Sequence, residues 1–281
     1  MNRLLSAALP ALLLGACAGS PATGDAAATP AAAPAGAVSL EAAIAGDWRS
    51  PTNAARDRYR HPRETLGFFG VQPGQTVVEI TPGGGWYAEI LAPWLADTGH
   101  YVAALARPTA PDGEASADRQ ALATRFAADP AHFGSATTIE FDPQAPVFGP
   151  PASADAVLTF RNVHNWVMAG TQAAMFRGFY EVLKPGGVLG VTDHRANPGP
   201  ATDGRQGYVT EQQVIDYANA AGFVLDGRSE INANPKDRKT YPQGVWTLPP
   251  SLALGDRDRA TYLAIGESDR MTLRFRKPRH D

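Results

Sequence analysis

The chain has 281 residues, of which 44% are hydrophobic and 19% charged, and its formal net charge at pH 7 is −3. A slightly acidic balance without a basic run offers no electrostatic footprint for nucleic acid, so we expect no nucleic-acid partner. Cys17 is the only cysteine, which excludes an intramolecular disulfide.

Residues 1–17 have the pattern of an export signal. Arg3 supplies a positive charge, and the apolar run from Leu4 to Leu14 is too short to span a membrane as a mature helix. The run closes in the letters LGAC, which resemble a bacterial lipobox whose cysteine, here Cys17, is lipidated. Ala18 after it resembles lipoproteins sent on to the outer membrane. We expect an exported protein, lipid-anchored at the periplasmic face of the outer membrane, with the lipid as its only membrane contact. The alternative is an accidental cysteine in an apolar leader.

A change of composition separates this leader from the rest of the chain. Residues 18–38 are almost wholly Ala, Pro, Gly, Ser and Thr, a composition that cannot bury enough apolar surface to fold, so we predict a flexible tether. Residues 39–281 are long enough for one substantial α/β domain.

The domain begins with a predicted helix over Ser39 to Asp47, capped by its serine. A polar cluster then precedes the first predicted strand, and it consists of Tyr59, Arg60, His61, Arg63 and Glu64. Solvated helix residues with satisfied ion pairs are one interpretation, and residues that close over a ligand are the other.

The pattern of the sequence changes period at a glycine turn. Val77 to Ile80 suits a buried strand, the turn follows at residues 82–85, and apolar residues then recur at helical spacing from Trp86 to Trp94. Such a turn lets a ligand approach the backbone closely and exposes amide donors to an anionic group. We therefore predict a cofactor site at the end of this strand.

Further strands and helices alternate along the chain. The predicted strands are Tyr101–Leu105, Thr137–Phe141, Ala154–Phe160, Val188–His194, one within Phe223–Ile231, and Met271–Lys277. The predicted helices are Ser116–Ala128, Ala173–Leu183 and Glu211–Ala221. This alternation predicts an α/β fold with a mainly parallel sheet and helices on both faces.

Three stretches of the sequence resemble the class I S-adenosylmethionine-dependent methyltransferases. They are VVEITPGGGW at 77–86, DAVLTFRNVHNW at 155–166 and VLKPGGVLGVTDH at 182–194, within a likeness that runs from about Gly70 to Leu225. The phrases RNVHNW and ESDRMTLRFRKP resemble a group of predicted exported bacterial methyltransferases. The resemblance implies a Rossmann-like, seven-stranded, mostly parallel sheet with an antiparallel last strand, and S-adenosylmethionine as cofactor.

The resemblance also implies which residues contact the cofactor. Glu79 stands at the acidic position of the glycine motif, and Asp142 matches the acid that contacts the adenine amino group. The implied cofactor-binding set is Glu79, Thr81, Pro82, Gly83, Gly84, Gly85, Trp86, Asp142, Arg161 and Asn162.

Two positions depart from the family pattern. Thr81 replaces a usual glycine, which predicts a turn that is wider or shaped by Pro82. The second strand, YVAALARP, lacks the acid that usually holds the ribose hydroxyls.

Two histidines follow neighbouring strands, where ligands of open α/β sheets bind. His164 and His194 are the candidate catalytic bases, because an imidazole titrates near neutral pH, and the alternative is that either one anchors a loop. No spacing of His, Asp and Glu resembles a metal cage, so we predict no metal.

A long insertion separates the last two strands. Residues 232–268 hold Tyr241, Trp246, two adjacent prolines and Tyr262, and we predict a lid over the cofactor cleft beside Tyr59; a surface cover is the alternative. We expect the arginines of the last strand to alternate onto one solvated face; they are Arg270, Arg274 and Arg276.

We therefore expect a lipid-anchored S-adenosylmethionine-dependent methyltransferase that acts on a small-molecule or envelope substrate. Two alternatives stay open. The first is a non-catalytic envelope binding protein on the same fold. The second is an NADP-binding enzyme, for which Arg107 lies near the required place although the glycines do not give G-x-G-x-x-G.

Overall fold

The computed structural model describes residues 37–108 and 114–279. The predicted signal, Cys17 and nearly all of the tether lie outside these residues. Within the described part of the chain, no helix combines the length and the apolar character that crossing a membrane requires.

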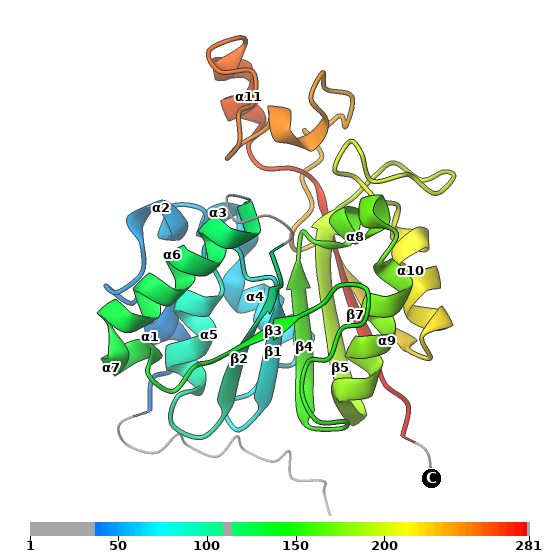
Figure 1. Cartoon of the computed structure of the whole chain (residues 1–281). Coiled ribbons are helices and arrows are strands. Elements are labelled where there is room, and N and C mark those ends of the chain that lie inside the picture. Colours follow the sequence, from blue (N-terminus) through cyan, green and yellow to red (C-terminus); the bar gives the residue numbers. More distant parts are fainter. Residues whose placement is uncertain (1–36, 109–113, 280–281) are drawn as a thin grey trace, which may run out of the picture. The chain divides into compact units, whose positions relative to one another are not determined.

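The domain is organised around one sheet of seven strands in the order β3-β2-β1-β4-β5-β7-β6 (Figure 1). The strands are β1 Thr76–Ile80, β2 His100–Ala106, β3 Thr137–Phe141, β4 Ala154–Phe160, β5 Leu183–His194, β6 Val224–Ser229 and β7 Arg270–Arg276. Strands β1 to β5 pair in parallel, whereas β7 is antiparallel to both β5 and β6. The predicted Rossmann-like sheet with an antiparallel last strand is confirmed.

Helices fill the connections between the strands. The α-helices are α1 Leu40–Ile44, α2 Pro51–Ala54, α3 Asp57–Arg60, α4 Pro62–Phe69, α5 Ala88–Leu95, α6 Glu114–Ala128, α7 Pro130–Phe133, α8 Val163–Ala169, α9 Gln172–Val182, α10 Glu211–Ala220 and α11 Arg259–Ile265. A 3₁₀ turn, η1, spans Gly244–Thr247. The predicted cap is present, because the Ser39 hydroxyl accepts the Ala42 N–H at 3.1 Å.

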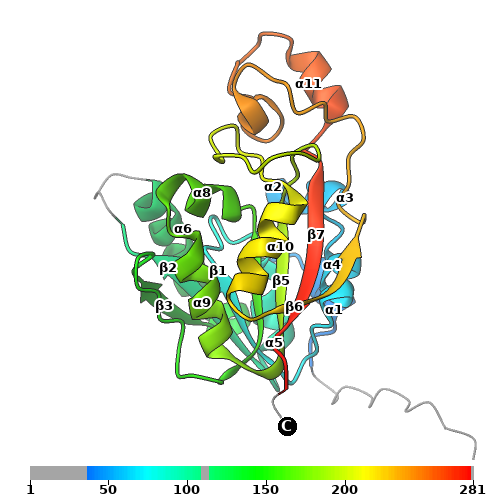
Figure 2. The ribbon, with the colours of Figure 1, turned by 90° about the vertical axis from the view of Figure 1, so that its right-hand side faces the viewer.

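Alternate residues of each central strand enter two separate hydrophobic cores. Val77 of β1 packs with α1, α4 and α5, whereas Val78 packs with α8, α9 and α10. The two groups of helices lie on opposite faces of the sheet (Figures 1 and 2). Burial on both faces explains why the apolar residues of β1 do not alternate with exposed ones, and why even Glu79 in this strand is buried.

Strand β5 begins five residues before the predicted strand, at residue 183 instead of 188, and includes the expected KPGG turn. The reason is the chain that follows β7. Lys277 accepts the N–H of Gly186 at 2.8 Å and donates its own N–H to Gly187 at 3.0 Å. These bonds extend the sheet through the glycines, and Gly186 adopts a left-handed φ of 81°.

The prediction that all three arginines of the last strand are solvated is wrong for Arg270. Its side chain is buried, because the insertion brings Glu267 to its Nη1 at 3.1 Å. Arg274 and Arg276 instead share Asp226 at 2.7 and 2.8 Å, near the surface.

The strand order fixes the place of a ligand site. The chain leaves β1 toward β2 and β3, and leaves β4 toward β5, so β1 and β4 are the neighbours between which the connections diverge. A crevice forms at the carboxyl ends of strands at such a switch point.

Candidate active site

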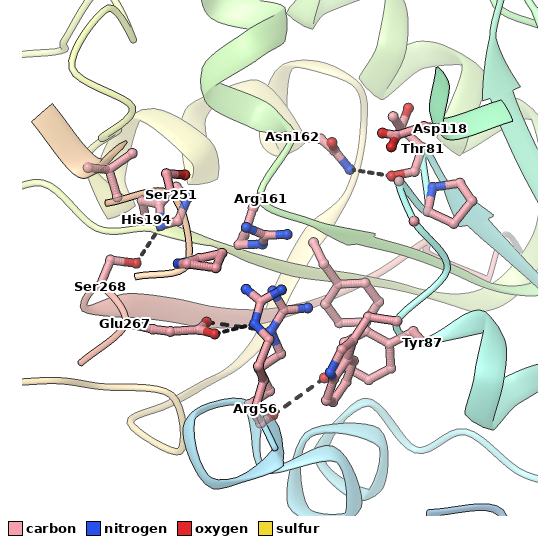
Figure 3. Close-up of a pocket in the computed structure, with 18 of the residues that line it drawn as sticks. Arg56, Thr81, Tyr87, Asp118, Arg161, Asn162, His194, Ser251, Glu267 and Ser268 are labelled. Carbon is pink, nitrogen blue, oxygen red and sulfur yellow. Dashed lines mark hydrogen bonds and ion pairs between the residues drawn. The ribbon is translucent and has the colours of Figure 1, made fainter. Parts of the chain in front are cut away.

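A cavity of about 570 Å³ lies beyond the carboxyl ends of β1, β4 and β5 (Figure 3). Its wall joins the glycine turn, the start of α8, the segment around α3 and the insertion. The residues that line the cavity include Arg56, Arg60, Glu79, Thr81, Gly84, Trp86, Asp118, Arg161, Asn162, His164, His194, Trp246, Glu267 and Ser268.

The glycine turn closes on Pro82, whose carbonyl accepts the N–H of Gly85 at 3.1 Å, so the alternative of a turn shaped by Pro82 describes it. Thr81 itself adopts a left-handed φ of 51°, as do Gly83 at 58° and Gly85 at 84°. The N–H of Thr81 donates to Ala104 O at 2.8 Å, and this bond fixes the turn to the neighbouring strand β2. A β-branched residue in this conformation costs about 1–2 kcal/mol, and this cost explains why glycine suits the position better.

Glycine is needed at different positions of the turn for different reasons. A Cβ on Gly85 would lie 2.8 Å from a methyl group of Leu122, so the packing of α6 requires glycine there. A Cβ on Gly84 would meet no atom within 4 Å, because this residue faces the open cavity. Gly83 and Gly84 line the cavity, as predicted, whereas Gly85 lies behind them.

Asn162 ties the ends of the two central strands together. Its amide Nδ2 donates to Ile80 O at 2.9 Å and to the hydroxyl of Thr159 at 3.1 Å, and lies 3.4 Å from Thr81 O. The side chain therefore holds the start of the glycine turn.

Glu79 is buried at the base of the cavity with only 2% of its surface exposed. Burial raises the pKa of its carboxyl to about 7, although the Tyr101 hydroxyl donates to it at 2.7 Å.

Asp118 of α6 is a residue that the sequence analysis missed. It lines the cavity, and its Oδ2 lies 3.5 Å from the position that a Cβ on Gly83 would take. It thus brings a carboxylate to the glycine turn, where the second strand offers none. Figure 3 shows Asp118 beside Thr81.

Two residues from the sequence predictions lie away from this cavity. Asp142 is exposed and accepts the N–H of Gln144 at 2.9 Å. Arg107, on which the NADP alternative depended, is also exposed and is not part of the cavity wall.

The two predicted histidines meet in the cavity wall, with ring centroids 5.3 Å apart. His164 Nδ1 lies 3.0 Å from Asp193 Oδ1, and His194 Nδ1 lies 2.5 Å from the hydroxyl of Ser268. Asp193 is fully buried, and its carboxylate also accepts the N–H groups of Val163 and His194. These bonds fix both rings.

The pKa of His194 lies well below its usual range. Burial is the main cause, and the neighbouring His164 ring is the second. His194 is therefore neutral at pH 7.

Ligand atoms of His164, Asp193 and His194 all lie within 4.8 Å of one another, a grouping that could hold a metal ion. The sequence spacing did not predict it. The carboxylate already accepts hydrogen bonds from backbone and ring N–H groups, and these bonds account for the closeness of the three side chains.

The polar cluster before β1 divides between solvent and cavity. Arg63 and Glu64 are exposed, as the solvated interpretation predicts, whereas Arg60 is only 5% exposed and lies in the cavity wall. Its guanidinium lies 4.8 Å from the centroid of the Trp86 ring and its Nε lies 3.5 Å from Glu267.

The insertion contributes to the same cavity, which agrees with its predicted place over the cleft. Trp246 lies against His164 with centroids 6.1 Å apart, and Glu267 and Ser268 form the wall beside His194. In Figure 3 the insertion residues Ser251, Glu267 and Ser268 face the glycine turn across Arg161.

No protein-family model matches the sequence, and no curated protein matches it. Solved structures do. An S-adenosylmethionine-dependent methyltransferase from Aquifex aeolicus is 14% identical with a TM-score of 0.53, over 85% of this chain and 98% of that one. The glycopeptide N-methyltransferase MtfA is 14% identical with a TM-score of 0.50, over 82% of this chain and 100% of that one.

The [4+2]-cyclase SpnF is 18% identical with a TM-score of 0.58, over 86% of this chain and 93% of that one. At such low identity the likeness concerns the fold, and one fold hosts several reactions. The chain has the seven-stranded Rossmann-like fold of solved S-adenosylmethionine-dependent methyltransferases.

Proposed function

We propose that the chain is an S-adenosylmethionine-dependent methyltransferase, lipid-anchored in the cell envelope, that acts on a small-molecule or envelope substrate. The observation that carries the proposal is the cavity, which joins the glycine turn after β1 to the buried histidine pair after β4 and β5. When bound, the cofactor would supply an electrophilic methyl group on a sulfonium, with the neutral thioether S-adenosylhomocysteine as the leaving group.

The residues present fit this cofactor. The cavity of about 570 Å³ lies within the range of small-molecule sites, roughly 300–1,000 Å³. Gly84 leaves the turn open toward it, and the carboxylate of Asp118 stands beside Gly83. In this proposal Asp118 accepts the ribose hydroxyls in place of the acid that the second strand lacks.

The test is calorimetric titration of the full-length chain with S-adenosylmethionine and S-adenosylhomocysteine, with NADP as the comparison ligand. Gly84→Leu fills the open space at the turn, and Gly74→Leu is its matched control, because a Cβ at either glycine meets no atom within 4 Å. We expect micromolar binding that Gly84→Leu abolishes and Gly74→Leu retains. No binding to the folded parent, or equal binding by both variants, would contradict the proposal.

His164 is the proposed general base. Because its Nδ1–H donates to Asp193, Nε2 is the nitrogen left to accept a proton from the acceptor. The ¹⁵N shifts of the His164 ring at pH 8 should show the Nδ1–H tautomer, and Asp193→Asn should disturb it. A ring that carries its proton on Nε2 would contradict this role.

The lipid anchor is proposed at Cys17, on the basis of the lipobox pattern. Metabolic labelling with radioactive palmitate should mark the parent and leave Cys17→Ser unlabelled. Equal labelling of both proteins would contradict the anchor.

A non-catalytic envelope binding protein is the second candidate. The strained Thr81 and the acid-free second strand favour it, since both weaken the likeness to the family. Cofactor binding without release of S-adenosylhomocysteine in the presence of envelope extract would favour this candidate over the enzyme.

A further inference from the structure

Four guanidinium groups gather at one side of the cavity around a single carboxylate. Glu267 pairs with Arg56 Nε at 2.5 Å, with Arg270 Nη1 at 3.1 Å and with Arg60 Nε at 3.5 Å. Arg161 lies beside them and forms no ion pair with any acid in the described residues. We call these four arginines and Glu267 the arginine cluster.

Several buried donors of the arginine cluster have no hydrogen-bond partner among the residues that the structure describes. They are Arg56 Nη2, Arg60 Nε and Nη2, Arg161 Nε and Arg270 Nε, together with the Thr192 hydroxyl. Arg60, Arg161, Arg270 and Thr192 also line a second small cavity of about 10 Å³. Buried polar groups are normally paired, so these donors point to a missing acceptor.

The backbone holds Arg161 in this place at a cost. Arg161 adopts a left-handed φ of 62°, which is rare for a residue other than glycine, and its N–H donates to Thr192 O at 2.7 Å. Strain of this kind concentrates at ligand-binding positions.

Nearby acids do not supply the missing negative charge. Burial raises the pKa of Glu79 to about 7, and its carboxyl is bonded to Tyr101. Asp193 is occupied by His164 and backbone N–H groups, and Asp118 lies at the glycine-turn end of the cavity, as Figure 3 shows. Glu267 is therefore the one fully ionised glutamate beside four guanidinium groups, while Glu79 is about half ionised at pH 7.

We infer that the arginine cluster is an oxyanion-binding subsite, and that the acceptor of this pocket carries a carboxylate or phosphate group. Guanidinium groups bind such groups through two parallel hydrogen bonds. This assignment of the acceptor rests on the proposed function, whereas the subsite itself rests on the cluster alone.

The cofactor has a carboxylate of its own, and it is the other possible source of the anion. Its amino-acid end also carries an ammonium group and its sulfonium is positive, so the whole cofactor is a cation and adds to the positive charge near the cluster. An anionic acceptor offsets that charge, and we therefore assign the subsite to the acceptor.

The first experiment titrates the full-length chain with inorganic phosphate at constant ionic strength and follows binding by thermal shift and calorimetry. We expect saturable binding that Arg161→Gln weakens about tenfold or more, as expected for one charge-assisted hydrogen bond, and that Arg161→Lys partly restores. Arg177→Gln is the matched control, because Arg177 is exposed on α9 outside the cavity. Absence of saturable binding, or equal weakening by Arg161→Gln and Arg177→Gln, would overturn the subsite.

The second experiment titrates S-adenosylhomocysteine with and without saturating phosphate. Simultaneous binding, with a Kd changed less than about threefold, supports the acceptor assignment. If phosphate competes with S-adenosylhomocysteine but not with 5′-methylthioadenosine, which lacks the amino-acid end, the cluster binds the cofactor carboxylate. That result would overturn the acceptor assignment. Phosphate binding to a protein that binds no S-adenosylhomocysteine would overturn the proposed function, and with it the acceptor assignment, and would leave the subsite standing.

Discussion

Two buried glutamates line the same cavity and differ in charge. Glu79 lies on the glycine-turn side and is 2% exposed, whereas Glu267 lies on the insertion side and is 4% exposed. Burial raises the pKa of Glu79 to about 7. Burial also acts to raise the pKa of Glu267, but Arg270, Arg60 and Arg56 lower it to about 2.

The difference shows that burial alone does not decide the charge of an acid in this pocket, because neighbouring guanidinium groups outweigh it at Glu267 and not at Glu79. The Tyr101 hydroxyl donates one hydrogen bond to Glu79, with Arg60 as a weaker influence, while Glu267 faces three guanidinium groups directly. At pH 7 Glu79 is therefore only about half ionised at the base of the glycine-turn side, whereas Glu267 on the insertion side is fully ionised. A cofactor and an anionic acceptor place different demands on the two sides.

Replacement of the ionised acid should have the largest effect. Glu267→Gln leaves three arginines without their shared partner, and we expect a loss of about 3–5 kcal/mol in the free energy of unfolding at pH 7. Urea unfolding measures it, with the exposed Glu64→Gln as control. Addition of Arg56→Gln should recover part of the loss, since it removes one of the unpaired charges.

The pH dependence sharpens this prediction. The pKa of Glu267 is lower in the folded protein than its ordinary 4.5, so its stabilisation is present above pH 4.5 and is lost as the pH falls toward 2. Glu267→Gln should flatten the stability curve in that range. If the stability of Glu267→Gln fell between pH 4.5 and pH 2 as steeply as that of the parent, the result would contradict the ion pairs.

Replacement of the half-ionised acid should act in the opposite direction. The pKa of Glu79 is raised from 4.5 to about 7, so the folded protein loses stability as the pH rises between these values. Glu79→Gln should be more stable than the parent by about 3 kcal/mol at pH 8 and equal to it at pH 4. Urea unfolding at both pH values tests this, and a variant less stable at pH 8 would show that the charged form is satisfied.

Asp118 sharpens the comparison on the glycine-turn side. If its carboxylate accepts the ribose hydroxyls, Asp118→Asn should weaken S-adenosylhomocysteine binding about tenfold, or about 1.4 kcal/mol. Asp97→Asn removes the same charge at an exposed site and should bind as the parent does. Equal affinities of parent and Asp118→Asn would remove this residue from the cofactor site.

The smallest effect is expected at the strained turn. Thr81→Gly relieves a left-handed backbone that costs about 1–2 kcal/mol but adds about 0.5–1 kcal/mol of unfolded-state entropy, so we expect a net gain between about 0 and 1.5 kcal/mol. Equilibrium unfolding measures the gain. A clear loss would show that the Thr81 side chain makes a stabilising contact.

The sequence predicted the sheet better than the pocket, for a physical reason. Strands such as β1 and β4 are mostly apolar and buried on both faces, so each signal lies within a few residues. The histidines and the glycine turn were predicted because they directly follow such strands.

The arginine cluster depends on contacts between distant segments, so the sequence indicated Arg60 and Arg161 one by one and not that they lie together beside Glu267. Arg56 and Glu267 are 211 residues apart, and Arg270 occupies the same alternate positions of β7 as Arg274 and Arg276, which are less buried. Asp118 lies in α6, a helix whose sequence is rich in polar and charged residues. Nothing in the sequence around Asp118 indicates that it lines the cavity. Thr81 stands where the resemblance expects glycine, and the sequence did not indicate that its backbone adopts a left-handed φ of 51°.

The most direct test of the account is a crystal structure of the protein with S-adenosylhomocysteine. We predict that the ligand lies along the turn from Thr81 to Trp86, with its ribose at Asp118 and its sulfur toward the side of the cavity that holds His164 and Arg161. A ligand bound elsewhere, or a cavity that stays empty at saturating concentration, would contradict it.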